Sequence, residues 1–263
     1  MVEEKGTVFF PDPVLWETPP DYGFHAYEDV FFMTEDGVRL HGWWIPGTDA
    51  RAVLLWFHGN AGNIGYRLDN LKRLHDMLPL STFLFDYREF GRSEGRISKA
   101  GTFLDAEAAY GYLVKERGIP ENRILLFGRS LGSALAVHVA ARHRPLGLIL
   151  EAAFTSTDDM MRLYFPHGAP PGLSESKYDS KSLMDRVRCP VLFLHGQLDS
   201  AIPLWMPQEL YEKTQAPKRF HVVRRADHND TYVVGGEEYF SWWREFLDFC
   251  LERSGMTQDP PRE

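Results

Sequence analysis

Apolar strand-like runs alternate with helix-like segments along most of this chain. The runs are near-continuous in apolar character, as at 53–57, so both faces of these strands are expected to be buried. Strands that alternate with helices and are buried on both faces predict a parallel sheet with helices on each side. The expected strands are 29–34, 38–45, 53–57, 82–87, 123–127, 147–150, 191–194 and 219–224, and the expected helices are 64–78, 101–117, 131–143, 155–164, 203–214 and 236–251.

The first two expected strands are separated by Glu35, Asp36 and Gly37, which form a hairpin-type turn. These two strands should therefore be antiparallel, and the later ones follow as strand–helix units. The predicted fold class is α/β: an open, eight-stranded, mostly parallel, doubly wound sheet. In such sheets, ligands bind beyond the carboxyl ends of the strands.

The 263 residues are expected to divide into an arm, one domain and a tail. Residues 1–26 hold four prolines together with aromatic residues, which predicts an extended arm packed on the body. Residues 27–252 should form the single α/β domain, and 253–263 a C-terminal tail. A lid at about 155–188 has room for a helix and a loop but hardly for a cap domain, so a minimal lid is expected.

The charge balance limits the classes of partner. The net charge is −8 with acidic and basic residues mixed, whereas nucleic-acid binding needs a concentrated basic surface, so no nucleic-acid partner is expected. The first residues lack the apolar stretch of a signal peptide, and no run approaches the roughly 20 apolar residues of a membrane span. A cytoplasmic protein without an integral membrane anchor is expected, and both a monomer and a dimer stay open.

The pentapeptide Gly128-Arg129-Ser130-Leu131-Gly132 lies between an expected strand and an expected helix. A serine at such a strand-to-helix turn, flanked by glycines, is typical of a nucleophile elbow. Glycine fits there because the turn leaves no room for side chains and because glycine tolerates unusual backbone angles. The hydroxyl of Ser130 should therefore project from the sheet at the start of the next helix.

A serine hydroxyl is a weak nucleophile and needs a base, which in turn needs an orienting group. In elbow-type sites the chain order is serine, acid, histidine. Of the ten histidines, His228 alone combines this order with a position in the loop after the last strand. We therefore predict that His228 is the base.

Asp199 is the favoured acid, because it follows the strand 191–194 by a short loop. Its role would be to fix the tautomer of His228. Two alternatives stay open: Asp199 could be a turn or helix-capping residue, and Glu151, at the end of the strand 147–150, could supply the carboxylate instead.

The oxyanion of such a reaction needs N–H donors that are already in position. The amide of Leu131, directly after the serine, is predicted to be one donor. The backbone amide of Asn60, in the glycine-flanked loop after the strand 53–57, is predicted to be the other, with Ala61 as the alternative. The residues that bind the rest of a substrate are not predicted.

Six ordered motifs show a family resemblance: DGVRLHGW at 36–43, HGNAGN at 58–63, DYREFGRS at 86–93, GRSLG at 128–132, HGQLD at 195–199 and DHND at 227–230. With these motifs the chain resembles the α/β-hydrolase superfamily over residues 27–252. It is most similar to the Bem46-like group of serine hydrolases. The resemblance implies an α/β-hydrolase fold and a serine-dependent hydrolytic activity.

The expected function is hydrolysis of a small carboxylic ester or thioester through an acyl-enzyme on Ser130, with Asp199 and His228. The alternatives are a peptidase or amidase on the same residues, a thioesterase of the protein-depalmitoylating type, and a non-catalytic binding protein. No metal-ligand spacing, G-x-G-x-x-G string or P-loop string occurs, so neither a metal nor a cofactor is expected.

Overall fold

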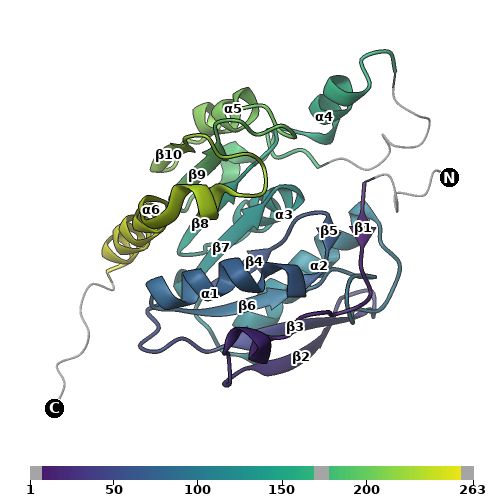
Figure 1. Cartoon of the computed structure of the whole chain (residues 1–263), viewed down its shortest axis with the longest axis vertical. Coiled ribbons are helices and arrows are strands. Elements are labelled where there is room, and N and C mark those ends of the chain that lie inside the picture. The colour runs from purple at the N-terminus through teal and green to yellow at the C-terminus, as the bar shows by residue number, and fades with distance from the viewer. Residues whose placement is uncertain (1–7, 169–177, 256–263) are drawn as a thin grey trace.

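The structure is a computed structural model that describes residues 8–168 and 178–255. Its main feature is one eight-stranded sheet in the order β10-β9-β8-β7-β4-β6-β3-β2 (Figure 1). The strands are β2 Glu28–Met33, β3 Arg39–Ile45, β4 Ala52–Phe57, β6 Leu80–Phe85, β7 Ile124–Arg129, β8 Gly147–Glu151, β9 Val191–Gly196 and β10 Lys218–Val223. The hairpin β2–β3 and the pair β3–β6 are antiparallel, and the remaining pairs are parallel. The predicted eight-stranded, mostly parallel sheet is confirmed.

Helices cover both faces of the sheet, because alternate residues of the strands point to opposite sides. In β4, Val53 and Leu55 pack into one apolar core, and Leu54 and Trp56 pack into the other. Helices α2, α3 and α5 complete the first core, and α1 and α6 complete the second (Figure 1). The helices are α1 Leu68–Met77, α2 Lys99–Gly111, α3 Leu131–Ala140, α4 Thr157–Tyr164, α5 Trp205–Lys213 and α6 Thr231–Arg253, with shorter turns at Pro19–Tyr22, Ile64–Arg67, Tyr112–Glu116, Glu121–Arg123 and Met184–Arg186.

The strand order reverses beside β4. The chain passes from β4 through α1 to β6 on one side, and then through α2 to β7 on the other side of β4. Phe57 pairs with Gly128, so the carboxyl ends of β4 and β7 lie next to each other. Such a reversal opens a crevice at the carboxyl ends of the strands, which is where doubly wound sheets bind ligands.

The N-terminal segment is tied to the loop that follows β4. Strand β1 (Phe10–Pro11) pairs in parallel with β5 (Ala61–Gly62). The backbone N–H of Phe10 donates to the carbonyl of Asn60 at 2.8 Å, and the side-chain amide of Asn60 donates to the carbonyl of Val8 at 2.6 Å. The arm therefore holds the β4 loop from outside the main sheet.

The last helix begins earlier than predicted. The sequence predicts a start at 236, but α6 begins at Thr231 and is kinked at Gly236, where φ is 51° and ψ is −137°. Glycine adopts this left-handed φ at little cost, so the chain bends there without ending the helix. In the expected lid region, α4 and the turn Met184–Arg186 are present, and 169–177 lie outside the described residues. Within the described parts of the chain, no helix has the length and apolar character needed to cross a bilayer.

Candidate active site

Ser130 occupies the sharp turn between β7 and α3. Its φ is 52° and its ψ is −121°, a conformation that residues other than glycine rarely adopt. The turn is fixed by two backbone hydrogen bonds, from the N–H of Ser130 to the carbonyl of Glu151 and from the N–H of Ser133 to the carbonyl of Ser130, both 2.9 Å long. A strained backbone that its surroundings hold in place is typical of functional sites.

The glycines on either side of Ser130 allow α3 to approach the sheet closely. A Cβ atom on Gly132 would lie 2.0 Å from the carbonyl oxygen of Phe57 and 2.7 Å from that of His58. A Cβ atom on Gly128 would lie 2.4 Å from the carbonyl oxygen of Gly132. The start of α3 therefore packs against the backbone at the end of β4, and this contact brings Ser130 next to the β4 loop.

Replacing Gly132 with alanine should destabilise the fold. The added methyl group would overlap backbone atoms that cannot rotate away, so the free energy of unfolding should fall by on the order of 3 kcal/mol. The matched control is Gly111→Ala at the end of α2, where φ is −58° and a Cβ atom would meet nothing within 4 Å. That variant should gain about 0.5–1 kcal/mol. Urea unfolding measures both values, and equal stability of the two variants would contradict the close packing at Gly132.

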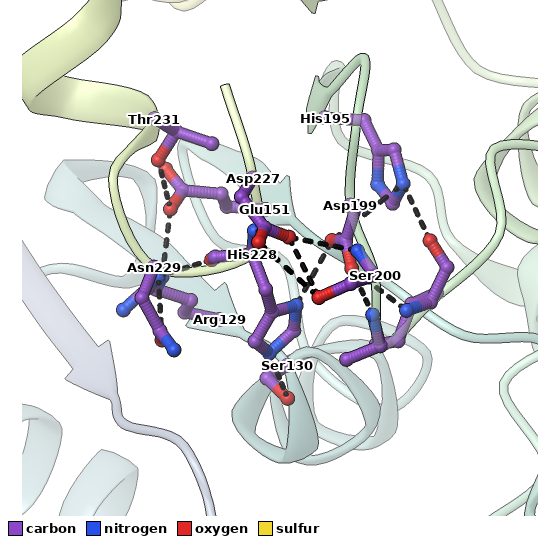
Figure 2. Close-up of polar contacts among 12 residues, drawn as sticks. Arg129, Ser130, Glu151, His195, Asp199, Ser200, Asp227, His228, Asn229 and Thr231 are labelled. Atoms are coloured by element: carbon purple, nitrogen blue, oxygen red, sulfur yellow. Dashed lines mark hydrogen bonds and ion pairs between the residues drawn. The ribbon is translucent and has the colours of Figure 1, made fainter. Parts of the chain in front are cut away.

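Three residues predicted from the sequence lie in one hydrogen-bonded chain (Figure 2). The Nε2 atom of His228 is 3.2 Å from the Oγ atom of Ser130, and its Nδ1 atom is 2.9 Å from Oδ2 of Asp199. An ionised carboxylate only accepts hydrogen bonds, so Nδ1 carries the proton and donates it to Asp199. Nε2 is then free to accept the hydroxyl proton of Ser130.

The carboxylate of Asp199 is buried, with 1% of the side chain exposed. Its Oδ1 atom accepts hydrogen bonds from the backbone N–H groups of Ala201, at 2.9 Å, and Ile202, at 2.7 Å. Burial acts to raise the pKa of Asp199, but the hydrogen bond and charge of His228, with the N–H of Ile202, outweigh it and hold the pKa below its ordinary value. The group is therefore an anion at neutral pH and can orient the imidazole.

Glu151, the alternative acid, has other partners. It is fully buried at the end of β8 and accepts hydrogen bonds from Arg129 Nε at 2.7 Å, from the hydroxyl of Thr231 at 2.8 Å and from the hydroxyl of Tyr239. Arg129 in turn donates to the backbone carbonyl of His228. Glu151 thus contacts the loop of His228 through Arg129. The imidazole ring itself contacts Asp199.

Replacing Glu151 with glutamine should lower stability. The substitution leaves the buried guanidinium of Arg129 without its counter-charge, which should reduce the free energy of unfolding by on the order of 3 kcal/mol. The matched control is Glu94→Gln, because Glu94 pairs with Arg39 at 2.7 Å while both side chains are 53% exposed. An exposed pair contributes about 1 kcal/mol or less. Thermal and urea unfolding compare the two variants, and equal losses would argue against a structural role of the buried pair.

Both predicted amide donors lie in segments that adjoin Ser130. Leu131 opens α3, and the first N–H groups of a helix have no partner within the helix. On the other side, a Cβ atom on Gly59 would lie 3.7 Å from Cβ of Ser130, so the loop carrying Asn60 passes directly beside the serine. The carbonyl of Ala61 accepts a hydrogen bond from the guanidinium of Arg67, which fixes the loop from the side opposite the arm.

A pocket of about 510 Å³ opens at Ser130 and His228. The β4 loop, Phe10 of the arm, Arg67 and Arg129 also line it. Neither Phe10 nor these arginines are among the site residues predicted from the sequence. Arg129 lies within the elbow motif itself, but no spacing rule marks an arginine there as a pocket residue. In residues 8–168 and 178–255, no group of three or more His, Cys, Asp or Glu residues is placed to hold a metal ion.

Comparison with known proteins reveals clear relatives. Protein Bem46 of Schizosaccharomyces pombe is 34% identical over 242 residues, which cover 88% of this chain and 79% of Bem46. The α/β hydrolase domain-containing protein WAV2 of Arabidopsis thaliana is 34% identical over 243 residues, covering 84% of this chain and 79% of WAV2. The chain belongs to the α/β-hydrolase family. The resemblance to the Bem46-like group is thereby confirmed.

A family profile described as serine aminopeptidase, S33, matches residues 48–175 of this α/β-hydrolase. Among solved structures, the Pyrococcus furiosus esterase Pf2001 superposes with a TM-score of 0.76 at 23% identity, covering 93% of this chain and 98% of the esterase. At this level of identity the likeness shows the shared fold.

Proposed function

We propose that this α/β-hydrolase cleaves carboxylic esters or thioesters through an acyl-enzyme on Ser130. The observation that carries the proposal is the hydrogen-bonded chain from Ser130 through His228 to Asp199, with distances of 3.2 and 2.9 Å. A serine beside a neutral imidazole that a buried carboxylate orients is an activated nucleophile.

In the proposed reaction, Oγ of Ser130 forms a bond to the acyl carbon while Nε2 of His228 takes the hydroxyl proton. The negative charge on the former carbonyl oxygen is held by the amides of Leu131 and Asn60, and one such donor contributes roughly 3 kcal/mol to the transition state. The tetrahedral intermediate collapses, the bond to the alcohol or thiol breaks, and His228 protonates the leaving group. Water then attacks the acyl-enzyme while His228 takes one of its protons. The bond between Oγ of Ser130 and the acyl carbon breaks, His228 returns the proton to Oγ, and the carboxylic acid leaves.

Two comparisons bear on the type of bond. The Pyrococcus furiosus protein Pf2001 and a Paenibacillus protein of similar fold are named as an esterase and an acetyl xylan esterase. The matching family profile carries the name of an aminopeptidase. We favour esters and thioesters because the pocket is open and the described part of the lid region is one short helix, α4, and a turn.

The test is active-site labelling followed by a substrate series. A fluorophosphonate probe should label Ser130, located by mass spectrometry of peptides, and Ser130→Ala should abolish the label. The control Ser241→Ala, in α6, should be labelled like the unmodified protein. The series compares 4-nitrophenyl esters from acetate to palmitate with thioesters and 4-nitroanilides. Turnover of anilides alone would favour a peptidase, and a protein neither labelled nor active on any substrate would be a binding module.

A further inference from the structure

Two arginines from distant parts of the chain line the pocket at Ser130. Arg67 ends the turn that follows the β4 loop, and Arg129 directly precedes the serine. Both line the same pocket as Ser130 and His228. Their two guanidinium groups stand in the wall of a pocket that also contains Asp12, in a protein whose net charge is −8.

Arg67 is a partly buried cation whose charge is not neutralised by an ion pair. Its Nη2 atom donates to the carbonyl of Ala61, and its Nε atom is buried without a hydrogen-bond partner. Among the residues that the structure describes, no carboxylate forms an ion pair with Arg67. Burial, and then the charge of Arg129, lower the pKa of Arg67 to about 10, so it remains charged at neutral pH.

Arg129 uses only two of its three guanidinium nitrogens in hydrogen bonds to the described residues. Arg129 donates from Nε to Glu151 and from Nη2 to the carbonyl of His228 and to Oδ1 of Asn229, the last at 3.2 Å. Its Nη1 atom makes no hydrogen bond to any described residue. Glu151 therefore offsets one of the two positive charges in the pocket wall.

Two other carboxylates lie near the pocket, and neither forms an ion pair with Arg67. Asp12 also lines the pocket, but its oxygens accept hydrogen bonds from the N–H of Val14, from the indole of Trp16 and from the hydroxyl of Tyr66. Asp86 raises the pKa of Arg67 through its charge, while its Oδ1 atom accepts the N–H of Ile64 and lies 3.4 Å from Nε2 of His58, and its Oδ2 atom has no hydrogen-bond partner among the described residues. The guanidinium of Arg67 thus has no carboxylate of the described residues in direct contact, and Asp86 acts on it only at longer range.

We propose that Arg67, with Arg129, binds an anionic group of the substrate, so that this enzyme acts on esters or thioesters that carry a carboxylate or phosphate a few bonds from the acyl carbonyl. This inference rests on the hydrolytic function proposed above. A guanidinium presents planar, paired N–H donors that match the oxygens of carboxylate and phosphate groups. Binding such an anion would also supply the missing counter-charge for a desolvated cation.

The test compares matched substrates in two arms. In the acyl arm, 4-nitrophenyl hydrogen glutarate is compared with its neutral methyl ester, 4-nitrophenyl methyl glutarate. In the alcohol arm, the pentanoyl ester of 3-hydroxypropyl phosphate is compared with the pentanoyl ester of neutral 3-methoxypropanol. The unmodified enzyme should show a kcat/KM at least about 10-fold higher for the anionic member in one arm, as expected for one charge-assisted hydrogen-bonded pair. Added salt should reduce this preference.

Three variants separate substrate binding from a structural role of Arg67. In Arg67→Met the anionic-to-neutral ratio of kcat/KM should fall toward 1, and Arg67→Lys should retain part of it. The matched control Arg73→Met removes a cation of α1 that pairs with Asp69 at 3.3 Å outside the pocket, and it should keep the ratio.

Two outcomes would overturn the proposal: no anionic preference in either arm, or an equal loss for anionic and neutral esters in Arg67→Met. The second result would mean that Arg67 only fixes the carbonyl of Ala61. Turnover of the neutral esters that depends on Ser130 would leave the hydrolytic function standing in both cases, so the two proposals can fail separately.

Discussion

Replacing Ser130 with alanine is expected to lower kcat/KM for ester hydrolysis by about four to six orders of magnitude. The substitution removes only Oγ, the atom that lies 3.2 Å from Nε2 of His228, and keeps the Cβ atom. The backbone at φ 52° is therefore equally strained in both proteins, and urea unfolding should give nearly the same midpoint. The measurement is initial-rate kinetics with 4-nitrophenyl butyrate, with enough protein to detect the residual rate.

The Ser241→Ala variant is the control for preparation and folding, and its kcat/KM should equal that of the unmodified protein. A Ser130→Ala variant that retained more than a tenth of the activity would show that Ser130 is not the nucleophile. Hydrolysis in that case would have to come from another group or from a contaminant, and the acyl-enzyme proposal would be abandoned.

Replacing Asp199 with asparagine is expected to lower kcat by about three to four orders of magnitude. Asparagine can keep an oxygen toward the N–H groups of Ala201 and Ile202, but its amide group would then face Nδ1 of His228 as a donor. The imidazole would have to accept there and carry its proton on Nε2, where it cannot take a proton from Ser130. The matched control is Asp227→Asn, because Asp227 accepts the backbone N–H groups of His228 and Ser200 rather than the ring. A loss within about tenfold is expected there, since the ring keeps its own carboxylate.

Acid stability offers an independent readout for Asp199. Its pKa in the folded protein lies below the ordinary value of 3.8, so ionised Asp199 stabilises the folded state above that pH. This contribution is lost as the pH falls through the lowered pKa, and Asp199→Asn should lack that part of the acid dependence. For the kinetic comparison, equal losses of kcat in Asp199→Asn and Asp227→Asn would contradict the prediction. They would mean that the loop as a whole, and not the contact of Asp199 with the ring, supports the reaction.

Much of the fold follows from local features of the sequence. The strands of the parallel sheet are buried on both faces, so their near-continuous apolar runs stand out from the helical periodicity. Gly128 and Gly132 mark the elbow because no other residue fits the approach of α3 to β4. The chain order and loop position of His228 likewise depend on sequence alone. The structure places it beside Ser130 and Asp199.

Other features depend on contacts that no local pattern encodes. Strands β1 and β5 have two residues each, too few for any periodicity to appear. Which of Asp199 and Glu151 contacts His228 depends on the packing at the end of β8, where Glu151 binds Arg129 and Tyr239 in the core. Arg67 and Arg129 likewise line one pocket only because β4 pairs with β7, which no local pattern predicts. Gly236 marked the wrong helix boundary, because its positive φ bends α6 without ending it.

The sequence separation of the contacts around Ser130 predicts when activity returns during refolding. Hydrogen bonds join His228 to Ser130 across 98 residues, Arg129 to Asn229 across 100, and Asn60 to Val8 of the arm across 52. Contacts between such distant residues require long loops to close, and parallel strand pairing forms slowly for that reason. Helical circular dichroism should therefore recover before hydrolysis does. Turnover would then report the packing of the last strands and of the arm against the rest of the protein. It is therefore a probe for complete folding of the chain.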